Sequence, residues 1–148
     1  MQQILNQLPY SSPFLFVDEI INVDIESILG KFTFSPDLDF YKGHFENDPV
    51  TPGVILIECM AQIGVVCLGI YLLNQEKEDD HKAKIAMTSS EIEYLKPVYP
   101  GETVTVESEK QYFRFNKLKC VVKMFNSEKD LVCRGVIAGM IIKDKNQV

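Results

Sequence analysis

The stretch His44–Gln62, which reads HFENDPVTPGVILIECMAQ, decides how the rest of the chain must fold. Its second half opens an apolar segment that continues to Leu73. Pro52 favours a helix start at Gly53, because its φ angle is already fixed and a first helical residue needs no hydrogen-bond donor. The predicted helix is apolar on nearly all sides, so we expect other structure to enclose it.

Segments on both sides of this helix have the composition and alternation of β-strands. We expect strands at residues 14–23 and 27–35 before the helix, and at residues 85–95, 102–115, 118–126 and 131–143 after it. This order predicts an α+β fold, a curved antiparallel sheet wrapped around one long central helix, in a single domain spanning residues 1–148. Such a sheet leaves edges that a second subunit could cover or extend.

The charge balance argues against nucleic-acid binding. The 148 residues carry a formal net charge of −6 and include only two arginines, Arg114 and Arg134, whereas nucleic-acid binding needs basic patches that neutralise phosphates. The cysteines have no Cys-x-x-Cys spacing, so we expect them to be small buried hydrophobes in a reducing compartment. They are Cys59, Cys67, Cys120 and Cys133.

The apolar segment from Val54 to Leu73 has almost the length of a membrane span. Glu58 and Gln62 interrupt it, and acidic residues follow it. We therefore predict a buried core helix and no membrane span. The N-terminus lacks the basic-then-apolar order of a signal peptide, so a cytoplasmic location is expected.

Two side chains of this stretch have the chemistry of an acid–base pair. Glu58 sits near the start of an all-round apolar helix, and burial favours the protonated form of a carboxyl group, which makes it a plausible proton donor. His44 precedes a proline-fixed turn that delivers N–H groups at a helix start, where negative charge is stabilised. A structural histidine and a buried acid bonded to a neighbouring strand or subunit are the alternatives. His81 lies in the charged run 75–84, which we expect to be a solvated loop.

These residues carry a resemblance to a known family. The segment GHFENDPVTPGVILIECMAQ at residues 43–62 resembles the active-site motif of the 3-hydroxyacyl-acyl-carrier-protein dehydratases, a hot-dog-fold family of fatty acid synthesis. The similarity extends through LPYSSPFLFVDEI at residues 8–20 and IEYLKPVYPGETV at residues 92–104. It therefore covers most of the chain, and it implies a hot-dog fold.

The resemblance implies a role for each residue of the motif. The family's catalytic histidine falls on His44 and its catalytic acid on Glu58, and a glutamate at that position is similar to the dehydratase-only branch. Gly53 matches the glycine whose N–H contacts the thioester carbonyl, and Val54 beside it is expected to bind substrate as well. Gln62 matches a glutamine that supports the acid.

The implied reaction is dehydration of (3R)-3-hydroxyacyl thioesters on acyl carrier protein to trans-2-enoyl thioesters, in fatty acid synthesis or a specialised polyene or acyl-chain pathway. It needs no metal or redox cofactor. The resemblance also implies a homodimer in which His44 of one subunit works with Glu58 of the other, and trimers of such dimers occur in the family. An acyl thioesterase of the same fold and a non-catalytic subunit that binds acyl carrier protein are the alternative functions.

The chain departs from the family pattern at three places. Within Glu46-Asn47-Asp48, Glu46-Asn47 stands where the dehydratase branch usually has proline and glycine after His-Phe, and Asp48-Pro49-Val50 is more similar to the dehydratase/isomerase branch. Thr51 replaces the usual methionine. Tyr10-Ser11-Ser12 stands where a more basic segment is common. These departures suggest a specialised branch of the family.

Overall fold

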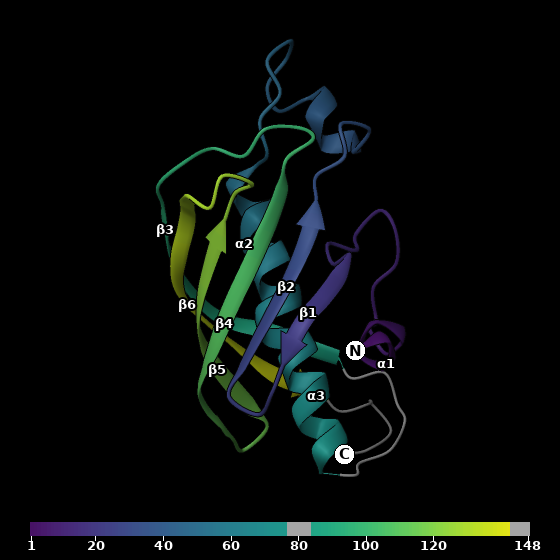
Figure 1. Ribbon diagram of the computed structural model, residues 1–148, viewed down its shortest axis with the longest axis vertical. Coiled ribbons are helices and arrows are strands. Elements are labelled where there is room, and N and C mark those ends of the chain that lie inside the picture. Colours follow the sequence, from purple (N-terminus) through teal and green to yellow (C-terminus); the bar gives the residue numbers. More distant parts are fainter. Residues whose placement is uncertain (77–83, 143–148) are drawn as a thin grey trace.

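The computed structural model of the chain describes residues 1–76 and 84–142. Its strands form one six-stranded sheet in the order β1-β2-β4-β5-β6-β3, and all neighbours run antiparallel. Figure 1 shows this sheet curving around one long helix, which confirms the expected α+β hot-dog architecture. The strands are β1 (Glu19–Val23), β2 (Ser27–Thr33), β3 (Lys84–Tyr94), β4 (Thr103–Arg114), β5 (Lys117–Phe125) and β6 (Leu131–Ile142).

The central helix runs without interruption through three segments. These are α2 (Gly53–Ala61), the π-helical stretch η2 (Gln62–Cys67) and α3 (Leu68–Gln75). Its π-helical part lies close against the sheet, because a Cβ added at Gly64 would lie 3.0 Å from the Cβ of Ser108 on β4. The Ser108 hydroxyl donates a hydrogen bond of 2.8 Å to the Gly64 carbonyl. A side-chain donor from the sheet thus satisfies one helix carbonyl at a place where the regular bonding pattern changes.

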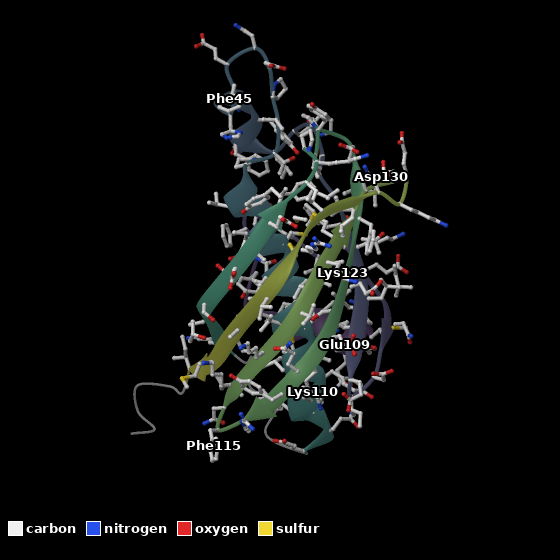
Figure 2. The ribbon with its side chains drawn as sticks, turned by 90° about the vertical axis from the view of Figure 1, so that its left-hand side faces the viewer. Phe45, Glu109, Lys110, Phe115, Lys123 and Asp130 are labelled. Carbon is white, nitrogen blue, oxygen red and sulfur yellow. The ribbon has the colours of Figure 1, made fainter. Side chains whose placement is uncertain are left out.

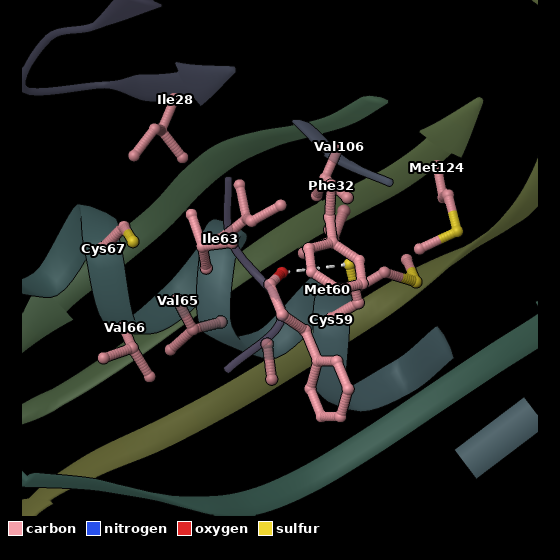
Figure 3. Close-up of a cluster of buried hydrophobic side chains, with 14 of the residues drawn as sticks. Ile28, Phe32, Cys59, Met60, Ile63, Val65, Val66, Cys67, Val106 and Met124 are labelled. Carbon is pink, nitrogen blue, oxygen red and sulfur yellow. Dashed lines mark hydrogen bonds between the residues drawn. The ribbon is translucent and has the colours of Figure 1, made fainter. Parts of the chain in front are cut away.

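The helix is long and apolar enough to cross a membrane by length and composition alone. However, 72% of its most apolar window is buried inside the folded chain. Inward-facing side chains of the sheet alternate with exposed ones along β4 and β5 and pack against it. Figure 3 shows part of the resulting core, including Ile63, Val106 and Met124. The helix is therefore the centre of the hydrophobic core, where apolar area removed from water stabilises the fold.

The four cysteines are free and buried, as expected for small hydrophobic core residues. The Cys133 thiol lies 3.3 Å from the sulfur of Met60, and the Cys59 thiol donates to the Phe16 carbonyl over 3.4 Å. Burial raises the pKa of the Cys133 thiol to about 12. These thiols therefore stay protonated and serve packing.

Two short segments differ from the sequence prediction. The strand expected over residues 14–23 begins only at Glu19, because the backbone of Phe14 and Phe16 bonds to the side chain of Gln62 instead of a neighbouring strand. A 3-10 helix, η1 (Asp39–Lys42), follows β2 directly ahead of His44. By contrast, the five-residue helix that opens the chain, α1 (Gln2–Asn6), agrees with the one or two helical turns expected over residues 2–8 before Pro9. Most of the run 75–84 with His81, and the last residue of the strand expected to end at position 143, lie outside the described residues.

Candidate active site

Glu58 lies at the wall of a groove between the central helix and the sheet. It sits in the second turn of α2 and is half-buried. The side chains around it come from the helix, from β3 and β6, and from the segment after α1. The residues that line this groove, which we call the Glu58 groove, are Tyr10, Glu58, Ala61, Val65, Val66, Ile85, Met87, Ile137, Ala138 and Gly139. A carboxyl group in this mostly apolar setting has few polar neighbours to stabilise its charge.

Gln62 fixes the orientation of the Glu58 carboxyl group. The Gln62 side chain is 0% exposed, and its Oε1 accepts a 2.8 Å hydrogen bond from the Phe16 N–H. Its Nε2 therefore faces the other way, and it donates to the Phe14 carbonyl over 3.1 Å and to Glu58 Oε2 over 2.9 Å. Because an amide nitrogen only donates, Glu58 Oε2 must accept. Because the carbonyl oxygen of a neutral carboxyl group is the better acceptor, this bond favours the proton of neutral Glu58 on Oε1, the oxygen that Gln62 leaves free.

The protonation of Glu58 is set by two opposing effects. Burial, the larger effect, raises the pKa of Glu58 above its ordinary value, whereas the hydrogen bond from Gln62 lowers it. The net pKa is raised. A carboxyl group with a raised pKa is a better proton donor near neutral pH, as general acid catalysis requires.

His44 lies in a short, exposed loop between η1 and α2. Hydrogen bonds from the Val50 N–H to the His44 carbonyl, at 2.8 Å, and between Phe45 and Asp48 close this loop on itself. The imidazole Nδ1 lies 2.9 Å from the Val50 carbonyl oxygen. Since a carbonyl can only accept, Nδ1 carries a proton, so in the neutral tautomer Nε2 has the free lone pair of a base. The ring stacks on Phe45, with 4.3 Å between the centroids.

The base of the His44 loop is anchored by a buried pair of hydroxyl groups. The hydroxyl oxygens of Tyr41 and Thr51 lie 2.5 Å apart. Tyr41 belongs to η1, before the loop, and Thr51 stands at the other end of the loop. The Thr51 N–H also donates to the Val98 carbonyl over 2.9 Å. Both ends of the loop are thus tied to the folded body of the chain.

The start of α2 offers backbone N–H groups to a ligand. The first N–H groups of a helix, here those of Gly53 and Val54, have no acceptor within the helix and attract negative charge. The Tyr94 hydroxyl donates to the Gly53 carbonyl over 3.0 Å, and a Cβ at position 53 would lie 3.1 Å from the Tyr94 ring. Glycine thus allows this ring to pack on the helix start. The Val54 side chain is 72% exposed and points away from the core.

The structure brings some of the predicted site residues together within one chain and keeps others apart. Glu58 and Gln62 are hydrogen-bonded, and Gly53 and Val54 lie one turn earlier on the same helix. His44 is not among the residues that line the Glu58 groove. Figure 2 shows Phe45, the neighbour of His44, at the end of the molecule opposite Phe115.

Sequence reasoning missed three contributors to this site. The Val50 carbonyl and the Phe14–Phe16 backbone act through main-chain groups, for which side-chain identity gives no signal. Tyr10 was noted as a departure from a basic segment, but its sequence position does not place it beside Glu58.

In residues 1–76 and 84–142, no cluster of three or more His, Cys, Asp or Glu side chains could hold a metal ion.

The chain folds as a curved antiparallel sheet around one helix, with a carboxylic acid in an apolar groove and a histidine before the helix. These features define a hot-dog-fold protein equipped for acid–base chemistry. The family model described as FabA-like domain matches residues 8–134. The chain therefore belongs to the FabA-like family.

Relatives with a described activity match over nearly the whole chain. The 3-hydroxyacyl-[acyl-carrier-protein] dehydratase FabZ of Chlamydia trachomatis serovar L2 is 29% identical over 99% of this chain and 94% of its own length. The enzyme of the same name from Ehrlichia canis is 30% identical over 95% and 94%. Among solved structures, the dehydratase heterocomplex ApeI:P from Xenorhabdus doucetiae aligns with a TM-score of 0.80 at 16% identity, over 97% of this chain and 93% of its own. This last match supports the fold alone.

Proposed function

We propose that the chain is a 3-hydroxyacyl-acyl-carrier-protein dehydratase, formed by one hot-dog domain that spans residues 1–148. The observation that carries the proposal is the state of Glu58. This carboxyl group has a raised pKa, and Gln62 occupies one of its oxygens so that the other presents the proton. Family membership and the dehydratase relatives support the same reaction.

In the proposed reaction His44 acts as the base and Glu58 as the acid. His44 Nε2 takes the proton from C2 of the acyl chain, and the electron pair of that C–H bond becomes the C2–C3 double bond. The C3–O bond breaks, and the hydroxyl group leaves as water with the Glu58 proton. The Gly53 N–H, with Val54 beside it, stabilises the negative charge that develops on the thioester oxygen. Solvent returns the proton from His44 to Glu58 before the next turnover.

We further propose that two copies of the chain share each site. The strand β3 is eleven residues long, lies at one edge of the sheet and is exposed along most of its length. An exposed edge of this length is suited to pairing with a second sheet. Ile85 and Met87 of β3 also line the Glu58 groove, so a second copy paired at this edge would lie beside Glu58. The partner's His44 is the base that this groove lacks.

The first experiment tests activity and the roles of the two residues. Purified wild type, His44→Ala and Glu58→Gln are assayed with a 3-hydroxyacyl thioester, and formation of the conjugated enoyl thioester is followed by absorbance. We expect both variants to lose most activity, and full activity in both would refute the assignment. Release of free thiol without enoyl product would identify a thioesterase instead. An inactive homodimer that a related subunit activates would identify a non-catalytic partner.

A mixing experiment tests the shared site. Inactive His44→Ala and Glu58→Gln chains are unfolded together and refolded. We expect recovery of about a quarter of wild-type activity, because half of the randomly formed twofold dimers contain one intact site of two. No recovery, with dimers confirmed by light scattering, would place both residues of a site in one chain. The molar mass from light scattering also distinguishes a dimer from a trimer of dimers.

The expected partner is acyl carrier protein in the cytoplasm, which presents the acyl chain as a thioester. A carrier-bound substrate should therefore have a higher kcat/KM than the same acyl group on a short thiol. Equal values would show that the carrier protein makes no contact of its own.

A further inference from the structure

The Glu58 groove contains a second polar group that the proposed reaction does not yet use. Eight of the ten residues that line it are apolar or lack a side chain, and only Tyr10 and Glu58 bring polar side chains. Tyr10 is close enough to feel the charge of Glu58, which contributes to raising the pKa of the phenol. A substrate in this groove therefore meets a carboxyl group and a phenol side by side.

Tyr10 is held at this place by the segment around it. Leu8, two residues earlier, is 3% exposed, and the Tyr10 ring packs against the core. On the other side, Gln62 fixes the backbone at Phe14 and Phe16 with hydrogen bonds of 3.1 Å and 2.8 Å. The same amide thus orients Glu58 and anchors the segment that carries Tyr10.

The Tyr10 hydroxyl has no hydrogen-bond partner among residues 1–76 and 84–142. No buried, unpaired polar side-chain atom occurs in this part of the chain, so the hydroxyl is open to the groove or to solvent. Tyrosine hydroxyls usually find a partner when they are buried. Binding of a ligand that fills the groove would bury this one, so the ligand must offer it an acceptor.

We propose that the Tyr10 hydroxyl donates a hydrogen bond to the 3-hydroxyl oxygen of the substrate and so selects acyl chains that carry this group beside Glu58. The proposal rests on the dehydratase function above. A hydroxyl oxygen has two lone pairs, so it can accept the Glu58 proton through one and the phenol hydrogen through the other. Burial, together with the nearby Glu58, raises the pKa of Tyr10 to about 12, so the phenol remains a donor at neutral pH.

The arrangement also explains how the groove distinguishes 3-hydroxyacyl chains from acyl chains without the hydroxyl group. The oxygen that leaves is the only acceptor that a 3-hydroxyacyl chain presents in the groove. Saturated acyl chains lack it, and they leave the phenol without a partner. A site that hydrogen-bonds a hydroxyl disfavours analogues that lack it. Tyr10 would therefore be a specificity-determining residue that touches substrate, while Glu58 remains the acid.

The test uses Tyr10→Phe, which removes the hydroxyl and keeps the ring. Two quantities are measured on the full-length protein: kcat/KM for (3R)-3-hydroxyoctanoyl-N-acetylcysteamine, and the inhibition constant of octanoyl-N-acetylcysteamine, which lacks the hydroxyl. We expect kcat/KM to fall about tenfold, the scale of one lost hydrogen bond. The inhibition constant should stay the same or fall, because the saturated chain no longer leaves a phenol hydroxyl without a partner. Tyr99→Phe, an exposed tyrosine outside the groove, is the matched control and should change neither quantity.

The outcomes separate this inference from the proposed function. Absence of dehydration by the wild type overturns the function. Unchanged kcat/KM in Tyr10→Phe beside an active wild type overturns the role of Tyr10 alone. An equal loss for the hydroxylated substrate and the saturated inhibitor would also overturn it, because it would show that Tyr10 only shapes the groove wall.

Discussion

Replacing Gln62 with methionine tests the structural account of the acid most directly. Methionine has a similar volume and no hydrogen-bonding amide, so packing changes little while three hydrogen bonds are lost. These are the bonds from the Phe16 N–H and to the Phe14 carbonyl and Glu58 Oε2. The first leaves the buried Phe16 N–H without a partner and the second leaves the part-buried Phe14 carbonyl without one, whereas the third removes the hydrogen bond that lowers the pKa of Glu58.

The magnitude follows from the number of groups left unsatisfied. An unsatisfied buried group costs about 1–3 kcal/mol and an ordinary hydrogen bond contributes about 1 kcal/mol, so losing the partners of the Phe16 N–H and the Phe14 carbonyl should lower the free energy of unfolding by roughly 2–4 kcal/mol. For a chain of this size that corresponds to a fall in Tm of about 4–16 °C. The variant and wild type must be compared at equal protein concentration, because association stabilises the folded state.

The same substitution has a signed effect on the pH profile. The Gln62 hydrogen bond favours charged Glu58, so its loss raises the pKa of Glu58 further. An acid must be protonated to act, and the alkaline limb of kcat/KM should therefore move to higher pH in Gln62→Met. Maximal activity should fall as well, because the proton is no longer confined to Oε1.

The matched control is Gln75→Met, the same change at an exposed position in the last turn of the helix. Surface substitutions usually stay within about 0.5 kcal/mol, so its Tm should equal that of wild type. If Gln62→Met were as stable as Gln75→Met and kept the alkaline limb of wild type, the role assigned to Gln62 would be wrong.

Two further predictions concern stability and the His44 loop. Glu58→Gln should be more stable than wild type at neutral pH. Burial raises the pKa of Glu58 in the folded state, so the wild type loses stability as pH rises through that pKa. The difference in unfolding free energy between Glu58→Gln and wild type should vanish below about pH 4, where the carboxyl is protonated even in the unfolded chain. Chemical denaturation across pH measures this difference, and a value that does not change with pH would contradict the prediction. Thr51→Val should cost about 1–3 kcal/mol and lower kcat, because the Tyr41 hydroxyl is left without its partner at the base of the loop, whereas Thr51→Ser should restore both.

The sequence predicts the elements of this fold well and their pairing less well. The central helix is enclosed because residues 53–73 are apolar on all sides, and this pattern is visible in the sequence alone. The π-helical stretch is not, and the contact made within it joins Gly64 and Ser108, which are far apart in the chain. The placement of β3 at the edge beside β6 also follows from long-range pairing, which local periodicity does not encode.

At the candidate site, side-chain chemistry was predictable and main-chain chemistry was not. Glu58 is conspicuous because a carboxyl group is rare in an apolar helix, and the spacing of four places Gln62 on the same face. The bond from Nδ1 of His44 to the Val50 carbonyl leaves no mark in the sequence, because any residue at position 50 has that carbonyl. Likewise, the residues at positions 14 and 16 contribute only backbone groups to Gln62.

The acid and the base are held by separate parts of the chain, and this separation predicts how defects combine. Tyr10 lines the Glu58 groove and Gln62 is hydrogen-bonded to Glu58, whereas Thr51 anchors the loop of His44. If each site combines a groove from one copy with a loop from another, variants should fall into two complementation groups.

Gln62→Met refolded with His44→Ala should then recover activity, because one site of the mixed dimer has an intact groove and an intact loop. Gln62→Met refolded with Glu58→Gln should recover none beyond the residual activity of the two parents, because every groove in that mixture is impaired. Thr51→Val should behave in the opposite way, complementing Glu58→Gln and failing with His44→Ala. A single pair that complements within its own group would refute a site divided between groove and loop, whatever the activity of the wild type.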